Sequence, residues 1–228
     1  MSGSQPLGTG PEPLGSGPRP PGGDALAGLR AALLGGGVAL LPTDTVYGLA
    51  AALDAPAGVE ALYALKGRPR GQPCQVLLCA PALLDEALAP LDPRTRAAAA
   101  ALLPGPATCI VPDPTGRYAA AAGDEPGAVG VRAPRLTGPP AGLDIPLVAT
   151  SANRTGEPDP ATLDEVPAGL RAAAAAVLDA GRLPGTASAV VDLRPVVAGG
   201  PAALLRPGPD ADAVARALGA AAVRTVRP

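Results

Sequence analysis

Residues 38–50 read VALLPTDTVYGLA, a short apolar run that passes directly into a proline, two threonines, an aspartate and a tyrosine. An apolar run of this length, Val38 to Pro42, is typical of a buried strand rather than of a helix. In open α/β sheets, ligands bind beyond the ends of the strands. The stretch therefore predicts a buried strand followed by polar residues that belong to a ligand site.

Two further polar clusters follow apolar runs in the same way, SANRTG after IPLVAT and RPG after AALL. Strand patterns alternate with helical patterns along the rest of the chain, which indicates an α/β fold with one mostly buried sheet flanked by helices. The predicted strands cover residues 38–42, 74–80, 107–112, 127–134, 145–150, 188–193 and 202–208. The predicted helices cover residues 24–37, 55–67, 81–105 (broken near 90–93), 161–179 and 210–220.

The first 23 residues differ from the rest, because they are rich in glycine, proline and serine and show almost no periodic apolar signal. We expect a disordered tail over residues 1–23 and a single folded domain over 24–228. The start lacks a basic segment followed by an apolar run, so we expect no signal peptide. No apolar stretch reaches the roughly 18 residues that a membrane span requires, so we expect no membrane association.

Composition excludes several kinds of chemistry. The chain has no histidine, which rules out Ser-His-Asp triads, Cys-His dyads and histidine metal sites. The net charge of −2, without a basic block, argues against a dedicated nucleic-acid-binding protein. Cys74, Cys79 and Cys109 lie in apolar runs without CxxC spacing, so we expect buried free thiols and a cytoplasmic protein.

The basic residues are one lysine, Lys66, and 17 arginines, 18 in all. A compact ammonium and a planar guanidinium are not interchangeable beside a phosphate, so a lone lysine favours a functional position over a surface one. The chain lacks GxxxxGK[ST], and no GxGxxG follows its first strand. A polyphosphate could instead be held by fixed charges and polar donors. The candidates for this role are Lys66, Arg68, Arg132, Arg206, Ser151 and Asn153.

Seven motifs, PTDTVYGLA, ALKGRP, LLPGPAT, GVRAP, PLVATSAN, SAVVDL and LLRPG, occur in the order and roughly the spacing of the threonylcarbamoyl-AMP synthases. Over about residues 24–218 the chain resembles this YrdC-like family, in its short single-domain form. The resemblance implies a twisted α/β sheet with a concave polar cavity. It also implies a nucleotidyltransferase that joins L-threonine, bicarbonate or CO2 and ATP into threonylcarbamoyl-AMP and pyrophosphate, for threonylcarbamoyladenosine formation in tRNA.

The same resemblance assigns the site residues. It implies that Lys66 and Arg68 are catalytic, that L-threonine binds at Thr45, Arg132 and Ser188, and that ATP binds at Lys66, Arg68, Ser151, Asn153 and Arg206. Mg2+ is expected to arrive with ATP, and no dedicated protein metal site is expected. The expected partners are a tRNA threonylcarbamoyl transferase machinery and, as a second expectation, tRNA or another RNA.

The chain also departs from the family pattern. Leu77 stands where many members have a histidine, Ala189 replaces a threonine, and Ala187 lies where an acid is common. The segment 133–150 is short, and we expect no full helix there. These departures keep open a relative that acts on another amine. A second alternative is a non-catalytic RNA-binding module, because some members of this fold have a concave basic surface. Tyr47 is interpreted as a packing residue, and Asp44, Asp159, Asp164 and Glu165 as turn, loop or helix-start residues.

Overall fold

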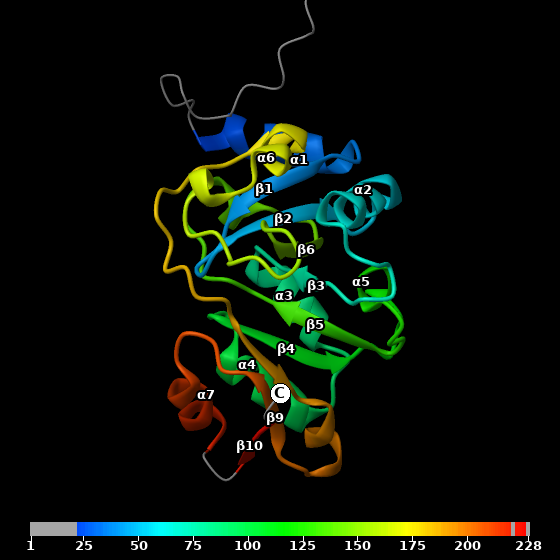
Figure 1. Cartoon of the computed structure of the whole chain (residues 1–228). Helices are drawn as coiled ribbons and strands as arrows, with labels where there is room; N and C mark the ends of the chain where they lie inside the picture. Colours follow the sequence, from blue (N-terminus) through cyan, green and yellow to red (C-terminus); the bar gives the residue numbers. More distant parts are fainter. Residues whose placement is uncertain (1–21, 220–221, 227–228) are drawn as a thin grey trace, which may run out of the picture.

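The computed structural model describes residues 22–219 and 222–226 (Figure 1). The tail predicted for residues 1–23 therefore lies outside the described residues, except for Gly22 and Gly23, which begin the first helix. The strands form one ten-stranded sheet in the order β10-β9-β8-β4-β5-β3-β6-β2-β1-β7. Their bounds are β1 (Val38–Pro42), β2 (Tyr47–Ala52), β3 (Gln75–Leu77), β4 (Ala107–Pro112), β5 (Ala128–Arg132), β6 (Leu147–Ser151), β7 (Ala176–Val177), β8 (Ala189–Asp192), β9 (Ala202–Arg206) and β10 (Val223–Thr225).

Helices α2, α3 and α4 begin where local sequence signals predict. Proline occupies the first turn of each of them, where its missing N–H costs nothing, and Asp92 caps α4 by accepting from the backbone N–H of Thr95. Gly67 ends α2 in the left-handed conformation, with φ of 62°. The helices are α1 (Gly22–Leu34), α2 (Pro56–Lys66), α3 (Pro81–Leu88), α4 (Pro93–Leu102), α5 (Ala119–Ala122), α6 (Ala168–Ala173) and α7 (Ala211–Leu218), and the 3-10 turns are η1 (Pro139–Gly142), η2 (Leu163–Glu165) and η3 (Arg194–Ala198).

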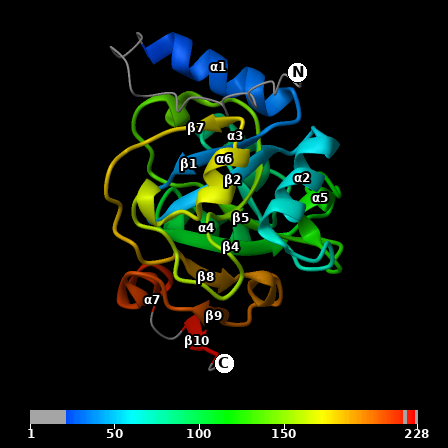
Figure 2. The same cartoon turned by 45° about the horizontal axis from the view of Figure 1, so that its top comes forward.

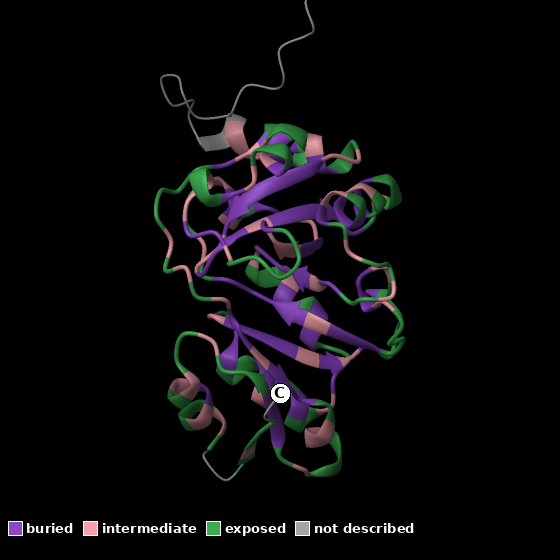
Figure 3. Cartoon of the chain, in the orientation of Figure 1, coloured by how far each residue is buried: buried purple, intermediate pink, exposed green. Residues whose placement is uncertain are grey.

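The two faces of the sheet are covered unequally. One face packs against α2 to α7 and forms the larger core. Every second residue of the strands points into this core, for example Cys109, Val131 and Val191. The other face packs against α1 and η1 in a smaller core at the end of the sheet that carries β1 and β7 (Figure 2). The strands are largely buried, and the outer sides of the helices are exposed (Figure 3). The smaller core stops short of β4, β5 and β8, so their residues on this second face are free to form a site.

The prediction missed one central strand and was wrong about one helix. Residues 47–52, for which we predicted no strand, form β2, which pairs antiparallel with both β1 and β6. The helix predicted over 161–179 is broken into η2, α6 and β7, because Pro167 starts a new helix and Ala176–Val177 pair with β1 instead. Alanine-rich sequence has high helix propensity, but strand pairing overrides it here. The absence of a full helix in 133–150 is confirmed, since the range holds the short turn η1 and then the start of β6.

The predicted fold class is confirmed, as a mixed α/β domain with a large twisted sheet flanked by helices. None of the helices within the described ranges combines the length and apolar character needed to cross a membrane.

Candidate functional site

A cavity of about 350 Å³ opens on the second face of the sheet. Its floor consists of residues of β3, β4, β5 and β8 whose side chains point away from the larger core. Its rim includes the β1–β2 loop and the end of β6. Six of the eight predicted site residues line it, and they are Thr45, Arg68, Arg132, Ser151, Ser188 and Arg206. The polar clusters that follow separate strands in the sequence thus converge on one cavity. Lys66 and Asn153 are not among the lining residues and lie behind Ser151.

The sole lysine is buried at the end of α2, and protein oxygens surround its ammonium group. Lys66 Nζ donates to the backbone oxygens of Ser151 at 2.8 Å and Asn153 at 2.7 Å, and it also contacts Asn153 Oδ1. An ammonium has three donors that can point to three converging acceptors, which a planar guanidinium cannot do. In this structure Lys66 therefore positions the turn that carries Ser151. A direct contact between Lys66 and phosphate stays a prediction.

Burial lowers the pKa of Lys66 to about 8 from its ordinary 10.5, and the charge of Asp159 opposes this shift. Because Lys66 is the only lysine, 13Cε-lysine labelling gives a single signal from the folded protein, and we expect it to titrate near pH 8. The unfolded chain then binds more protons between about pH 8 and 10.5, so this group makes the fold more stable as pH rises through that window. A midpoint near 10.5 would show that the surrounding oxygens outweigh burial.

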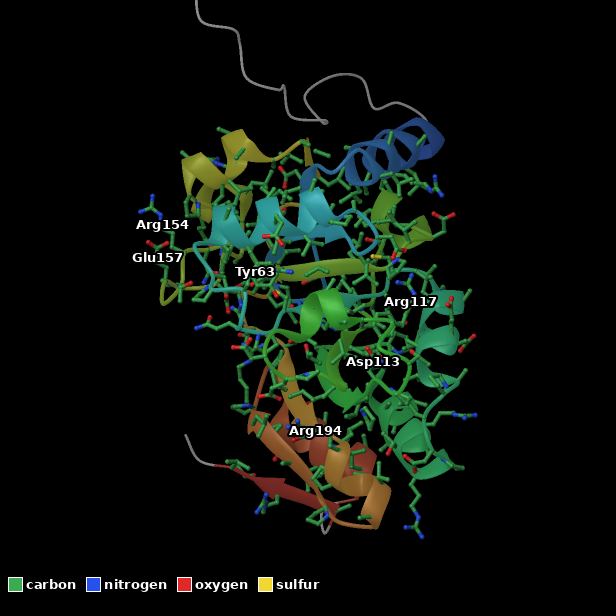
Figure 4. The ribbon with its side chains drawn as sticks, turned by 90° about the vertical axis from the view of Figure 1, so that its right-hand side faces the viewer. Tyr63, Asp113, Arg117, Arg154, Glu157 and Arg194 are labelled. Carbon is green, nitrogen blue, oxygen red and sulfur yellow. The ribbon has the colours of Figure 1, made fainter. Side chains whose placement is uncertain are left out.

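The turn after β6 is held by its own polar side chains. Ser151 Oγ donates to Asn153 Oδ1 at 2.7 Å, and Asn153 Nδ2 donates to the Glu157 backbone oxygen at 2.6 Å and to Asp159 Oδ1 at 3.2 Å. Arg154 and Glu157 point away from the fold into solvent (Figure 4). Asp159 lines the cavity, so our interpretation of it as a simple loop residue missed a candidate site residue.

Arg132 is 1% exposed, yet it lines the cavity at the end of β5. Its guanidinium forms an ion pair with Asp44 and donates to the backbone oxygens of Gly105 and Ala107. Asp44 also accepts from the backbone N–H of Arg135 at 3.1 Å. Asp44 is therefore more than the turn former we expected, because it balances the one guanidinium that the fold buries almost completely within the described residues. A guanidinium has five donors, and these contacts leave at least two for a ligand.

The hydroxyl of Thr45 is presented to the cavity by a tight turn between β1 and β2. Thr43 Oγ1 accepts from the backbone N–H groups of Thr45 and Val46 and lies 3.0 Å from Thr45 Oγ1. Tyr47, the next strand residue, has its hydroxyl 2.8 Å from Asp179 Oδ1, outside the cavity lining, and burial raises its pKa to about 12. The structure thus agrees with a packing role for Tyr47.

At the far side of the cavity, Arg206 at the end of β9 binds Ser188, donating to its backbone oxygen at 2.8 Å and to its hydroxyl at 3.3 Å. The Ser188 hydroxyl lies 3.0 Å from that of Thr108, which donates to Gln75 Oε1 at 2.9 Å. Sequence reasoning did not find Gln75 and Thr108, because they lie on the face of the sheet rather than in a polar cluster after a strand.

The arrangement combines hydroxyls, guanidinium groups and two carboxylates, Asp159 and Glu125, around one hollow. Arg68, Arg132 and Arg206 give it positive charge suited to anionic groups. The three cysteines are free and buried, as expected. Within residues 22–219 and 222–226, no three histidine, cysteine, aspartate or glutamate side chains are grouped so that they could hold a metal ion.

Comparison with known proteins gives a consistent result. Residues 31–208 match the Sua5/YciO/YrdC family, whose description reads "Telomere recombination". A threonylcarbamoyl-AMP synthase of Chromohalobacter salexigens is 37% identical over 141 residues, which are 59% of this chain and 74% of that protein. A putative threonylcarbamoyl-AMP synthase of Mycobacterium tuberculosis is 31% identical over 196 residues, which are 82% of this chain and 86% of that protein.

Solved structures share the fold. The structure of P. abyssi Sua5 complexed with L-threonine superposes with a TM-score of 0.76 at 26% identity. That match covers 91% of this chain and 61% of the Sua5 chain, so this chain spans less than two thirds of it. E. coli YciO has a TM-score of 0.69 at 19% identity, a likeness of fold alone.

Proposed function

Because the chain belongs to the Sua5/YciO/YrdC family, we propose that it is an L-threonylcarbamoyladenylate synthase, a nucleotidyltransferase that acts on L-threonine, bicarbonate or CO2, and ATP. The observation that carries the proposal is the single cavity where Thr45, Arg132 and Ser188 meet Arg68, Ser151 and Arg206. The related Sua5 protein was solved in complex with L-threonine, which supports an amino-acid substrate for this chain.

The chemistry suits a site without histidine. The amine of threonine takes up CO2 to form a carbamate, and a carbamate oxygen then attacks the α-phosphorus of ATP and displaces pyrophosphate. This step depends on alignment and on neutralising charge more than on a protein base. Arg68 and Arg206 would neutralise phosphate charge, and Ser151 would donate to a phosphate oxygen once its hydroxyl turns away from Asn153 Oδ1. The free donors of Arg132 would bind the carboxylate of threonine.

Mg2+ would enter with ATP as part of the substrate. This ion usually takes one or two carboxylates together with phosphate oxygens and water, so a dense cluster of protein ligands is unnecessary. Of the two carboxylates in the cavity lining, Glu125 is paired with Arg194, so Asp159 is the one that would fit that need. The adenylate would then pass, in the cytoplasm, to an enzyme that transfers the threonylcarbamoyl group to tRNA.

The direct test is pyrophosphate release by the purified full chain with ATP, Mg2+ and bicarbonate, with and without L-threonine. We expect release that requires L-threonine, together with a product of the mass of threonylcarbamoyl-AMP. Release that requires a different amine would favour the second candidate, a relative with another amine substrate. One observation supports that candidate, since Leu77 lines the cavity and offers no polar group to the hydroxyl of threonine. Absence of release with any amine would contradict both.

Replacing Thr45 with valine is expected to raise KM for L-threonine about tenfold and to leave KM for ATP unchanged. The change removes a cavity hydroxyl that is only 2% exposed while it keeps nearly the same shape, and a lost hydrogen bond is worth about 1 kcal/mol. Thr137→Val is the matched control, because Thr137 is exposed and lies outside the cavity lining. Equal changes in both KM values would contradict the assignment of Thr45 to threonine.

A further inference from the structure

Four cavity residues from four strands or strand ends are joined in one chain of hydrogen bonds, Gln75–Thr108–Ser188–Arg206. Each of the four lines the cavity. Thr108 and Ser188 are buried, with 5% of each residue exposed. The chain begins at an amide on β3 and ends at a guanidinium on β9, so it crosses much of the sheet below the cavity.

The direction of this chain follows from its two ends. Gln75 Oε1 is an acceptor, so the Thr108 hydroxyl donates its only proton to it, at 2.9 Å between the oxygens. Thr108 Oγ1 can then only accept from Ser188. The Ser188 hydroxyl therefore donates its own proton to Thr108 Oγ1, at 3.0 Å between the oxygens. Arg206 is a donor and occupies one lone pair of Ser188 Oγ at 3.3 Å. One lone pair of Ser188 Oγ remains, and it can only accept a hydrogen bond from a ligand.

The contact between Gln75 and Thr108 depends on a glycine. In the order of the sheet β5 lies between β3 and β4, and Gln75 is directly paired with Gly130 of β5. A Cβ added at Gly130 would lie 3.2 Å from Thr108 Cγ2 and 3.9 Å from Gln75 Cβ. The missing side chain leaves the space in which the Gln75 amide reaches across β5.

We infer that Gln75 is a positioning residue of the amino-acid subsite, acting through Thr108 to fix Ser188 as an acceptor for the amino group of the substrate. The inference rests on the proposed function, which places threonine beside Ser188. Without the Gln75 acceptor, the Thr108 proton is free to turn toward Ser188. Ser188 can then turn its own proton into the cavity, toward an amine that needs an acceptor.

The test compares Gln75→Leu with Gln72→Leu, the same change at an exposed glutamine outside the cavity lining. We expect Gln75→Leu to raise KM for L-threonine about five- to tenfold, the size of one hydrogen bond, with KM for ATP unchanged and Gln72→Leu like the wild type. Thr108→Val should give a similar rise. The double variant Gln75→Leu/Thr108→Val should be no worse than Thr108→Val alone, because both act through one path.

Each outcome decides the inference. Unchanged KM for L-threonine in Gln75→Leu, an equal rise in KM for ATP, or additive effects in the double variant would overturn it, and thermal unfolding checks that each variant is folded. Calorimetric binding of L-threonine to the full chain separates this inference from the proposed function. If the wild type binds L-threonine but releases no pyrophosphate, the synthase proposal fails, and about five- to tenfold weaker binding of L-threonine by Gln75→Leu still tests the inference. If the wild type does not bind L-threonine, both are wrong.

Discussion

Replacing Asp44 with alanine is expected to lower the free energy of unfolding by about 3–5 kcal/mol, the cost of leaving one member of a buried ion pair without its partner. The side chain of Arg132 is only 1% exposed, and Asp44 is the carboxylate paired with its guanidinium. Without Asp44 the charge of Arg132 stays buried and only backbone oxygens oppose it. Urea unfolding, monitored by circular dichroism, measures the loss.

The control is Asp54→Ala, which removes a carboxylate of the same kind from the surface. Both carboxylate oxygens of Asp54 accept from Arg117 at 2.9 Å, which is a bidentate ion pair. The side chain of Asp54 is nevertheless 66% exposed. Exposed ion pairs contribute about 0–1 kcal/mol, so we expect a loss in that range. Similar losses of unfolding free energy in the two variants would show that the burial of Arg132 does not increase the contribution of Asp44 to stability. Figure 4 labels Arg117, the partner in the control pair.

The importance of Asp44 could not be predicted from the sequence, for a physical reason. Its partner lies 88 residues further along the chain, and the two meet only because the sheet brings β5 close to β2, with β3 and β6 between them. An aspartate between two threonines has the local pattern of a turn, and the chain does bend there, held by the hydroxyl of Thr43. The one available signal was the cluster itself, a carboxylate within a predicted ligand site.

The elements that the sequence predicted correctly are those in which local preference and tertiary packing agree. Residues 38–42 and 55–67 are examples, with an uninterrupted apolar run in the first and proline and glycine at the ends of the second. Prediction failed where the secondary structure of a segment depends on the strands that pair with it. Residues 47–52 become a strand because β1 and β6 lie on both sides, and Ala176–Val177 leave a helical pattern to extend the sheet edge beside β1.

The candidate site shows the same division. Residues within polar clusters after strands, such as Ser151 and Arg206, were predicted and do face one cavity. Gln75 and Thr108 stand inside apolar runs, and only the register across Gly130 shows that both point to the cavity. A single polar residue within a strand gives little information about which face it occupies until its neighbours in the sheet are known.

Replacing Lys66 with arginine is expected to reduce threonine-dependent pyrophosphate release about a hundredfold, although the positive charge is kept. The ammonium group donates to oxygens of Ser151 and Asn153 that converge on a single atom. A guanidinium is larger and spreads its donors in a plane, so it cannot reproduce these bonds in a buried site. Three hydrogen bonds of about 1 kcal/mol each correspond to about a hundredfold in rate, if all of them hold Ser151 in its working position.

The matched control is Arg182→Lys, an exchange between the same two residue types at a side chain that is 71% exposed. There we expect rates within about twofold of the wild type, since an exposed ion pair such as Arg182–Glu165 contributes little. Because the rate measurement presupposes the proposed reaction, urea unfolding provides an independent result, with a loss of about 1–3 kcal/mol for Lys66→Arg from unsatisfied buried oxygens. A Lys66→Arg variant with full activity and stability would mean that the oxygens accept any cation. The position of the only lysine in a chain with 17 arginines would then have no explanation in the geometry of this site.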